Sequence, residues 1–274
     1  MRIQEIRSRD AAFQKFQVLK TNRNKRHRYG EFFVEGVRNI NGAVENGWRI
    51  ASFLFPRERP LSGWAQERLE RVPTEVNYRL DPALLDELSG KEDSSELMAV
   101  VKMRPNRLDL LALGKNPLLM LFDRPSNRGN LGTLLRSCDG FGVQGLILTG
   151  HGVDLYDPEV LAASMGSFFR VPAVQAENRE MAAFLKDLRE AYPGFRTIGT
   201  TAHRQHPIYG QDLTGPILLM LGNETDGLSY AYKQSCDRLC TIPMAEDSSA
   251  SSFNVACAGT VLLYEAARQR AALT

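Results

Sequence analysis

The sequence predicts an α/β protein of two domains, and three observations support this fold class. Its 274 residues allow two ordinary domains, because a domain most often contains roughly 100 to 200 residues. Short apolar runs typical of strands alternate with helical patterns along both halves. The segment RPNRLDLLALGKNP, with two prolines and mixed charge, separates the halves. We therefore expect domains at residues 1–103 and 116–274, joined by a linker at 104–115.

The first half carries the pattern of a compact α/β domain between residues 31 and 103. The runs EFFVEG, IASFLF, EVNYRL and LMAVVKM are typical of strands. Helices are expected at GVRNINGAVENG, at residues 62–72 and at DPALLDELSG.

The second half gives stronger signals, beginning with LLMLFD, a nearly all-apolar strand typical of a sheet covered on both faces. A turn and a helix follow, with Leu131, Leu134, Leu135 and Cys138 at helical spacing. Further strands are expected at GLILTG, 171–175, RTIGTT, ILLMLG and RLCTIPM, and further helices at 157–165 and 178–190.

The last helix, from about Asn254 to Arg268, is apolar on most sides between Val255 and Leu263. Such a helix is buried, either against its own sheet or against a second copy of the protein. We expect a homodimer.

Composition limits the class of protein. With 43% hydrophobic and 24% charged residues, the chain is typical of globular proteins. It has neither a signal peptide nor the roughly 18 continuous apolar residues of a membrane helix, so a soluble, cytoplasmic protein is expected. Neither the cysteines nor the histidines suggest a metal site. Cys138, Cys236, Cys240 and Cys257 are expected as small buried side chains, and His151, His203 and His206 as solvated or structural residues.

A basic run extends from Ala11 to Gly30, where no acidic residue occurs. Its basic side chains are Lys15, Lys20, Arg23, Lys25, Arg26 and Arg28, interleaved with Phe13, Phe16, His27 and Tyr29. Such a run is either a solvated, mobile segment or a surface for phosphate contacts and base stacking. The choice depends on whether the rest of the chain has a reason to bind RNA.

One apparent motif misleads. Gly140, Gly142 and Gly145 form G-x-G-x-x-G, but here the glycines end a helix and lead into a strand. A dinucleotide-binding turn follows a strand and opens a helix, so no nicotinamide site is expected.

Three later segments contain polar residues at positions suited to a site. In NRGNLGTLLR, Asn130 is placed to cap a helix, and Arg136 shares a helix face with Gly132. In LMLGNETDGL, an apolar strand runs into an acidic turn bounded by glycines, at the sheet edge where α/β proteins bind ligands. In the third, IPM precedes SFNV at the start of the last helix.

Each segment also has a purely structural interpretation. The polar residues can be helix caps, the acidic segment a plain β-turn, and Arg136 a surface ion pair. Ile242, Met244 and Phe253 can be core, although they also suit a slot for a flat heterocycle such as adenine.

Together, the three segments resemble the motifs of the SpoU (TrmH-like) branch of the SPOUT RNA methyltransferases. The agreement comprises N-x-x-G-N-x-G-x-x-x-R, L-G-x-E-x-x-G-L-S, and I-P-M followed by S-x-N-V and L-L-Y-E-A. The segment DLYDPEVLAASMGSFFRVPAV is similar to a further family segment. This sequence departs from the pattern at Phe253, where leucine is more usual, and in a loop after Met244 about two residues longer than in many relatives.

The resemblance implies an N-terminal domain like a ribosomal-protein RNA binder and a C-terminal trefoil-knot (SPOUT) domain. The implied activity is transfer of a methyl group from S-adenosylmethionine to a ribose 2′-hydroxyl in RNA, with ribosomal RNA favoured over transfer RNA. The implied enzyme is dimeric and requires no metal.

The resemblance also implies roles for residues of this sequence. The expected catalytic residues are Arg136, Asn130, Glu224, Ser252 and Asn254. The expected cofactor-binding residues are Gly222, Asn223, Glu224, Ile242, Met244 and Phe253. RNA contacts are expected at Arg23, Lys25, Arg26 and Arg28. Arg136 acts either as a base or as an electrostatic catalyst, and a guanidinium, which keeps its charge in proteins, is an awkward base.

Two other functions remain open at this point. One is an RNA-binding protein that keeps the fold without chemistry, against which the presence of both Arg136 and Asn254 argues. The other is a small-molecule α/β enzyme using the same sheet edge, which leaves the basic run unexplained.

Overall fold

The computed structural model describes residues 2–202 and 206–272, and they form two compact units. The first unit contains the chain up to Pro105 together with Tyr156–Arg170, and the second contains Asn106–Leu155 and the chain from Val171. Residues 156–170 therefore pack with the first unit, although they lie within the range expected for the second domain. The expected domain boundaries at residues 103 and 116 remain a prediction.

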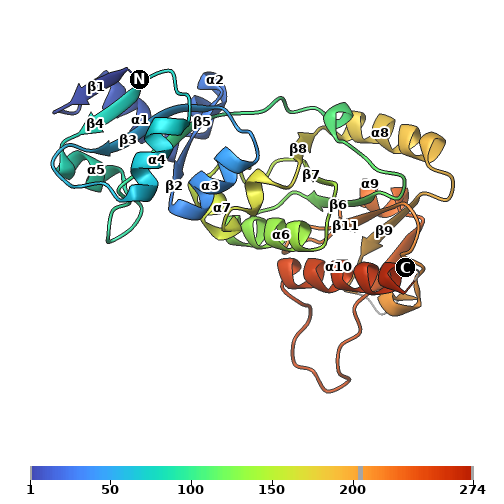
Figure 1. Cartoon of the computed structure of the whole chain (residues 1–274). Coiled ribbons are helices and arrows are strands. Elements are labelled where there is room, and N and C mark those ends of the chain that lie inside the picture. The colour runs from blue at the N-terminus through green and yellow to red at the C-terminus, as the bar shows by residue number, and fades with distance from the viewer. Residues whose placement is uncertain (1, 203–205, 273–274) are drawn as a thin grey trace. The chain divides into compact units, whose positions relative to one another are not determined.

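The first unit is built on a five-stranded sheet of order β1-β4-β3-β5-β2 (Figure 1). The strands are β1 (Ile3–Ile6), β2 (Glu31–Glu35), β3 (Ile50–Pro56), β4 (Asn77–Leu80) and β5 (Met98–Lys102). The helices are α1 (Ala11–Thr21), α2 (Arg23–Tyr29), α3 (Val37–Glu45), α4 (Gly63–Arg71) and α5 (Pro82–Leu88). Strand β5 runs antiparallel to β2 and β3, whereas β3, β4 and β1 are parallel.

Adjacent phenylalanines of β2 show how this sheet buries both faces, because successive strand side chains point to opposite sides. Phe33 joins a core that includes α1 and α5. Phe32 lies in an aromatic cluster whose other rings belong to Trp48, Tyr156, Phe168 and Phe169. The latter three residues come from or flank α7 (Pro158–Ser164) and η2 (Ser167–Phe169). The cluster is the reason that residues 156–170 belong to the first unit.

The basic run forms α1 and α2, and part of it is core. Asp10 and Asn22 cap the two helices through their side chains. Phe13 and Phe16 are 0% and 1% exposed, so the suggestion that they stack on bases is wrong. Apolar residues three apart on an 11-residue helix give it a buried face despite Lys15 and Lys20.

The structure also corrects the RNA contact expected for Arg26. Its side chain is 2% exposed and lies 3.5 Å from the carboxylate of Asp157. Its guanidinium donates to the carbonyl oxygens of Leu19 and Lys20 at 3.1 and 3.0 Å. Because a buried, satisfied guanidinium is not available to an RNA phosphate, Arg26 holds α1, α2 and α7 together instead.

The second unit contains a seven-stranded parallel sheet of order β10-β12-β9-β11-β6-β7-β8. Its strands are β6 (Leu118–Asp123), β7 (Gly145–Thr149), β8 (Ala173–Ala176), β9 (Arg196–Thr200), β10 (His206–Pro207), β11 (Ile217–Leu221) and β12 (Arg238–Thr241). Its helices are α6 (Arg128–Gly140), α8 (Asn178–Ala191), α9 (Tyr230–Ser235) and α10 (Val255–Ala271), with 3₁₀ turns η1 (Leu108–Leu110) and η3 (Ile208–Gly210).

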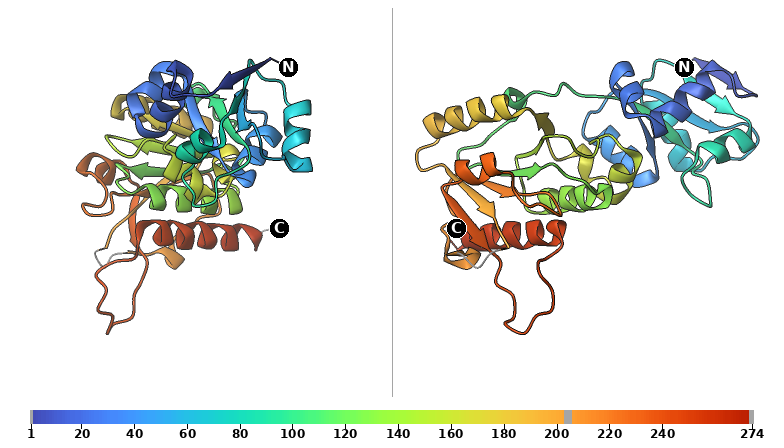
Figure 2. Two further views of the ribbon diagram at one scale, coloured as in Figure 1. Left: turned by 90° about the vertical axis from the view of Figure 1, so that its left-hand side faces the viewer. Right: turned by 180° about the vertical axis from the view of Figure 1, so that it is seen from behind.

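Helices cover both faces of this sheet (Figures 1 and 2). Residues of α8 and α9 share one core with alternate residues of β6 and β11. On the other face, α10 packs closely on α6, and Gly259 permits this approach. A Cβ at Gly259 would lie 2.5 Å from Leu134 and 2.9 Å from Leu221.

The register of β6 and β11 decides where the site forms. Leu221 pairs with Phe122 at the carboxyl ends of the two strands. The residues that follow, Asp123 and Gly222, therefore emerge at the same sheet edge, where open α/β sheets bind ligands.

From Asn106 onward, the expected linker packs as part of the second unit. Leu108, Leu111 and Leu113 lie partly buried against its core. The Asn106 side chain donates to the Gln175 carbonyl and accepts from the Gln175 amide, each at 2.7 Å. The side chain of Asn106 thus pairs with the backbone of β8.

Candidate active site

Helix α6 begins at the carboxyl edge of the sheet, and Asn127 caps it. The Oδ1 of Asn127 accepts from the amide of Asn130 at 2.9 Å. This satisfies one of the amides that a helix N-terminus leaves unpaired. It also places the side chain of Asn130 in the first turn, beside the turn that follows β11.

Glu224 joins these two segments. One carboxylate oxygen accepts from the amide and the hydroxyl of Ser126 at 2.9 and 2.6 Å, and the other accepts from the Asn127 amide at 3.0 Å and Asn130 Nδ2 at 3.2 Å. Partial burial acts to raise the pKa of Glu224, but the hydrogen bonds from Ser126 and Asn130 outweigh it and hold the pKa below its usual range. Glu224 is therefore an ionised clamp and not a proton donor.

The third segment reaches the same group through Asn254. Its Nδ2 donates to Asn130 Oδ1 at 2.9 Å, and its Oδ1 accepts from the amides of Ala256 and Cys257 at 2.9 and 3.3 Å. Asn254 thus caps α10 and fixes the amide of Asn130. Glu224, Asn130 and Asn254 form one connected polar group, and we call it the amide relay.

Arg136 lies further along α6 and is exposed. The side chain of Arg136 makes no hydrogen bond or ion pair with the described residues, so its guanidinium is available to a ligand. It stands six residues after Asn130, roughly 9 Å along the helix axis.

Gly222 is required by the turn that carries Glu224. A Cβ there would lie 1.9 Å from the amide nitrogen of Leu228, so any other residue would displace the backbone. Asn223 and Gly227 exchange two backbone hydrogen bonds at 3.1 and 3.0 Å, and Asn223 Oδ1 accepts from the amides of Thr225 and Asp226. The turn is therefore rigid and folded back on β11.

The remaining expected site residues do not join this group in the described chain. Ile242 and Met244 are half-buried, Ser252 is exposed, and Phe253 is 44% exposed. Residues 245–254 are exposed in a long loop that projects from the unit (Figures 1 and 2). The cofactor slot at Ile242, Met244 and Phe253 and the role of Ser252 stay predictions.

Sequence reasoning missed three polar residues at this edge, namely Asp123, Arg124 and Ser126. They follow directly on the apolar run LLMLF, and their place at a strand end was the available signal. Asp123 is buried, accepting from the Ser229 amide at 2.8 Å and Thr149 Oγ1 at 3.1 Å.

The cysteines and histidines agree only partly with expectation. Cys138 and Cys240 are buried and Cys236 is half-buried, but Cys257 is exposed, so its expected burial is wrong for the chain by itself. Burial raises the pKa of the Cys236 and Cys240 thiols to about 12. His151 and His206 are exposed, and His203 lies outside the described residues. No group of metal-ligating side chains occurs in the described chain.

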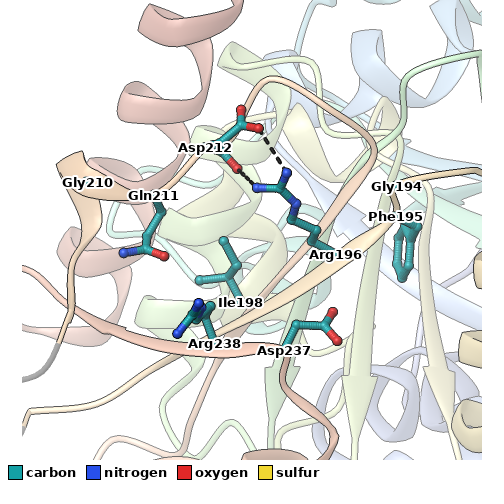
Figure 3. Close-up of a pocket in the computed structure, with 9 residues that line it drawn as sticks. All are labelled: Gly194, Phe195, Arg196, Ile198, Gly210, Gln211, Asp212, Asp237 and Arg238. Carbon is teal, nitrogen blue, oxygen red and sulfur yellow. Dashed lines mark hydrogen bonds and ion pairs between the residues drawn. The ribbon is translucent and has the colours of Figure 1, made fainter.

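A hollow of about 690 Å³ lies at the opposite, amino edge of the sheet (Figure 3). It contains the first residues of β9 and β12, Arg196 and Arg238. Arg196 is paired with Asp212 at 3.0 Å. None of the amide relay lines this hollow, so it is separate from the candidate site.

Comparison with known proteins identifies relatives over nearly the whole chain. Residues 117–264 match the SpoU rRNA methylase family, and residues 10–99 match the SpoU L30e-like domain. The chain is 45% identical over 267 residues, covering 97% of itself and 92% of the relative, to a 23S rRNA (uridine(2479)-2′-O)-methyltransferase of Streptomyces viridochromogenes. It is 35% identical over 251 residues, covering 88% and 98%, to the 23S rRNA (guanosine-2′-O-)-methyltransferase RlmB of Vibrio parahaemolyticus.

Solved structures give the same result. The SpoU methyltransferase AviRb from Streptomyces viridochromogenes, crystallised with AdoMet (S-adenosylmethionine), superposes with a TM-score of 0.91 at 44% identity, over 96% of this chain and 99% of AviRb. An RNA 2′-O ribose methyltransferase superposes with a TM-score of 0.80 at 27% identity, over 98% and 100% of the two chains.

The fold is that of a two-domain α/β RNA methyltransferase. The chain belongs to the SpoU rRNA methylase family. The comparisons confirm the expected fold class, cofactor and class of enzyme, an S-adenosylmethionine-dependent RNA 2′-O-methyltransferase. The described chain contains no helix long and apolar enough to cross a membrane.

Proposed function

We propose that this enzyme methylates a ribose 2′-hydroxyl of 23S ribosomal RNA, at a uridine in preference to a guanosine. The observation that carries the proposed active site is the amide relay at the carboxyl sheet edge, with the unpaired Arg136 on the same helix as Asn130. The choice of RNA and nucleoside is supported by the relatives, of which the one named for uridine is 45% identical and the one named for guanosine 35%.

The residues at this edge fit S-adenosylmethionine. The turn after β11 places the half-buried Asn223 and Glu224 at the sheet edge, and the half-buried Ile242 and Met244 supply apolar surface. When bound, the cofactor supplies an electrophilic methyl group: the oxygen–methyl bond forms as the sulfur–methyl bond breaks, leaving S-adenosylhomocysteine.

In the proposed mechanism, Arg136 donates a charge-assisted hydrogen bond to the oxygen on which negative charge develops. Arginine side chains keep their charge in proteins, so the hydroxyl proton leaves to water or to a neighbouring RNA phosphate. Asn130, Glu224, Ser252 and Asn254 position the ribose, and alignment of this kind can lower a barrier by roughly 7 to 11 kcal/mol.

RNA is held by the basic surface of α2, to which Arg23, Lys25 and Arg28 contribute. Tyr29 is 43% exposed, and the ammonium of Lys15 lies 5.3 Å from its ring centroid. An exposed ring beside cations suits base stacking with phosphate contacts. Arg26 is excluded from this surface by its burial.

The enzyme functions as a cytoplasmic homodimer in this proposal, and α10 supplies the interface. Cys257, Val261 and Tyr264 are exposed on this helix at spacings of four and three residues, which places them on one face. Val261→Glu is expected to convert dimer to monomer in light scattering. Tyr230→Glu is the matched control, since Tyr230 is 78% exposed elsewhere in the same unit. A dimeric Val261→Glu protein would contradict this interface.

The deciding experiment measures transfer of labelled methyl from S-adenosylmethionine to unmodified 23S, 16S and transfer RNA. Wild type is compared with Arg136→Ala and with Arg238→Ala, an exposed arginine at the opposite sheet edge. We expect ribose-methylated uridine in 23S RNA alone, a loss of about 100-fold or more for Arg136→Ala, and no loss for Arg238→Ala. Label in transfer RNA alone, or full activity of Arg136→Ala, would overturn the proposal.

A further inference from the structure

The turn that carries Glu224 is held by a residue outside the three family motifs, Arg124. This residue follows β6 directly and has a φ of +53°. A non-glycine residue adopts this left-handed conformation only where its surroundings hold it there.

The guanidinium of Arg124 reaches across to the turn after β11. Nη2 donates to the carbonyl oxygen of Gly227 at 2.9 Å, and Nη1 lies 3.6 Å from the carboxylate of Asp226. The backbone carbonyl of Arg124 accepts from Asn223 Nδ2 at 2.8 Å. Arg124 therefore binds the turn near its start and near its end.

The neighbouring residues are arranged around this side chain. Nε of Arg124 lies 3.2 Å from Asp123 Oδ2, and Asp123 in turn accepts from the Ser229 amide just beyond the turn. A Cβ at Gly150 would lie 2.6 Å from Cγ of Arg124, so glycine leaves the space in which the side chain crosses.

We infer that Arg124 is a positioning residue for the cofactor: it fixes the Gly222–Leu228 turn so that Gly222, Asn223 and Glu224 face the reactants. The inference rests on the proposed function, because it assigns the turn to the cofactor site. It predicts that losing the guanidinium weakens cofactor binding more than it slows the chemical step.

Two variants separate the side chain from the backbone. Arg124→Gly keeps the left-handed conformation at no steric cost and removes every contact of the guanidinium. Arg124→Lys keeps a cation near Asp123 but cannot donate in the planar fork of arginine. Arg196→Lys is the matched control, since Arg196 forms a comparable ion pair with Asp212 at the opposite edge (Figure 3).

The experiment is isothermal titration of full-length protein with S-adenosylmethionine, together with kcat at saturating cofactor and thermal unfolding. We expect the Kd to rise about tenfold or more for Arg124→Gly, to a smaller extent for Arg124→Lys, and not at all for Arg196→Lys. The kcat of Arg124→Lys at saturating cofactor should stay within about threefold of wild type, whereas Arg136→Ala should lose kcat and keep its Kd.

The outcomes separate this inference from the proposed function. If wild type, Arg124→Lys and Arg124→Gly all bind the cofactor with the same Kd, the inference is overturned and the proposed function stands. If Arg124→Lys loses kcat while its Kd is unchanged, Arg124 acts in the chemical step and the positioning role is overturned. If wild type binds no S-adenosylmethionine, both fail.

Discussion

Asn254 Nδ2 donates to Asn130 Oδ1 at 2.9 Å, joining two residues that are 124 positions apart in the chain. The side-chain oxygen Oδ1 of the same Asn254 caps α10. One side chain therefore has a structural and an orienting function, and substitutions can separate them.

Asn254→Ser is expected to retain the cap and lose the bond to Asn130, because serine caps helices well but its hydroxyl is too short to span both groups. Its thermal stability should stay near wild type while methyl transfer falls at least tenfold. Asn254→Ala should lose activity and also about 1 kcal/mol of unfolding free energy. Denaturant titration and transfer assays measure the two effects; full activity of Asn254→Ser would contradict an orienting role.

Glu224 should make stability depend on acidity. Its pKa is below the usual 4.5 in the folded protein, so the folded state binds this proton less readily than the unfolded state. The resulting stabilisation is fully present above about pH 4.5 and disappears as the pH falls through the folded pKa. Wild type should therefore exceed Glu224→Gln in unfolding free energy at pH 6, and the difference should shrink as the pH falls below about 4.5. A difference in unfolding free energy that did not change with pH would contradict the role of Glu224 as an ionised hydrogen-bond acceptor.

Phe13 and Tyr29 belong to the same basic run but should respond in opposite ways. Phe13→Ala removes a fully buried ring and is expected to cost about 3 to 5 kcal/mol of unfolding free energy. Tyr29→Ala removes a ring that is 43% exposed, so it should weaken RNA binding with little change in stability. Chemical denaturation and filter binding distinguish the two, and equal destabilisation by both would show that Tyr29 is core.

The thiols should differ in reactivity. In the monomer that Val261→Glu is designed to give, an alkylating reagent at pH 8 should modify exposed Cys257 first. Cys236 and Cys240 should react slowly, because burial raises the pKa of both to about 12 and the thiolate is the reactive form. Mass spectrometry locates the label, and denatured protein gives the full count. Equal rates at Cys240 and Cys257 would show that β12 is open to solvent.

Apart from β1 and β10, the strands of both units could be predicted because their sequence signal is strong. Runs such as LLMLFD and ILLMLG are almost entirely apolar, and the sheet that buries both of their faces requires this composition. Helix α1 was missed because Lys15 and Lys20 obscured Phe13, Phe16 and Leu19 at three-residue spacing. A basic run suggests a solvated surface, whereas a helix can carry charged residues beside a buried apolar face.

The site was predictable to the extent that strand ends and helix caps define it. Asn130, Glu224 and Asn254 come together because β6 and β11 are neighbours and α10 packs on α6. The place of Arg124 at a strand end was predictable, but its contact with Gly227 was not, because that contact depends on a left-handed backbone that no side-chain pattern predicts. The slot at Phe253 depends on a loop without local packing, and the trefoil knot remains a prediction from the resemblance.

The aromatic cluster around Phe32 has a consequence for dividing the chain. Tyr156, Phe168 and Phe169 enter that cluster from sequence beyond the start of the methylase match at residue 117, and Trp48 Nε1 donates to the Phe169 carbonyl at 2.9 Å. A fragment ending at Pro105 would leave Phe32 and Trp48 facing water. The first unit is thus not a detachable module, and a chimera that exchanges it must transplant residues 156–170 as well.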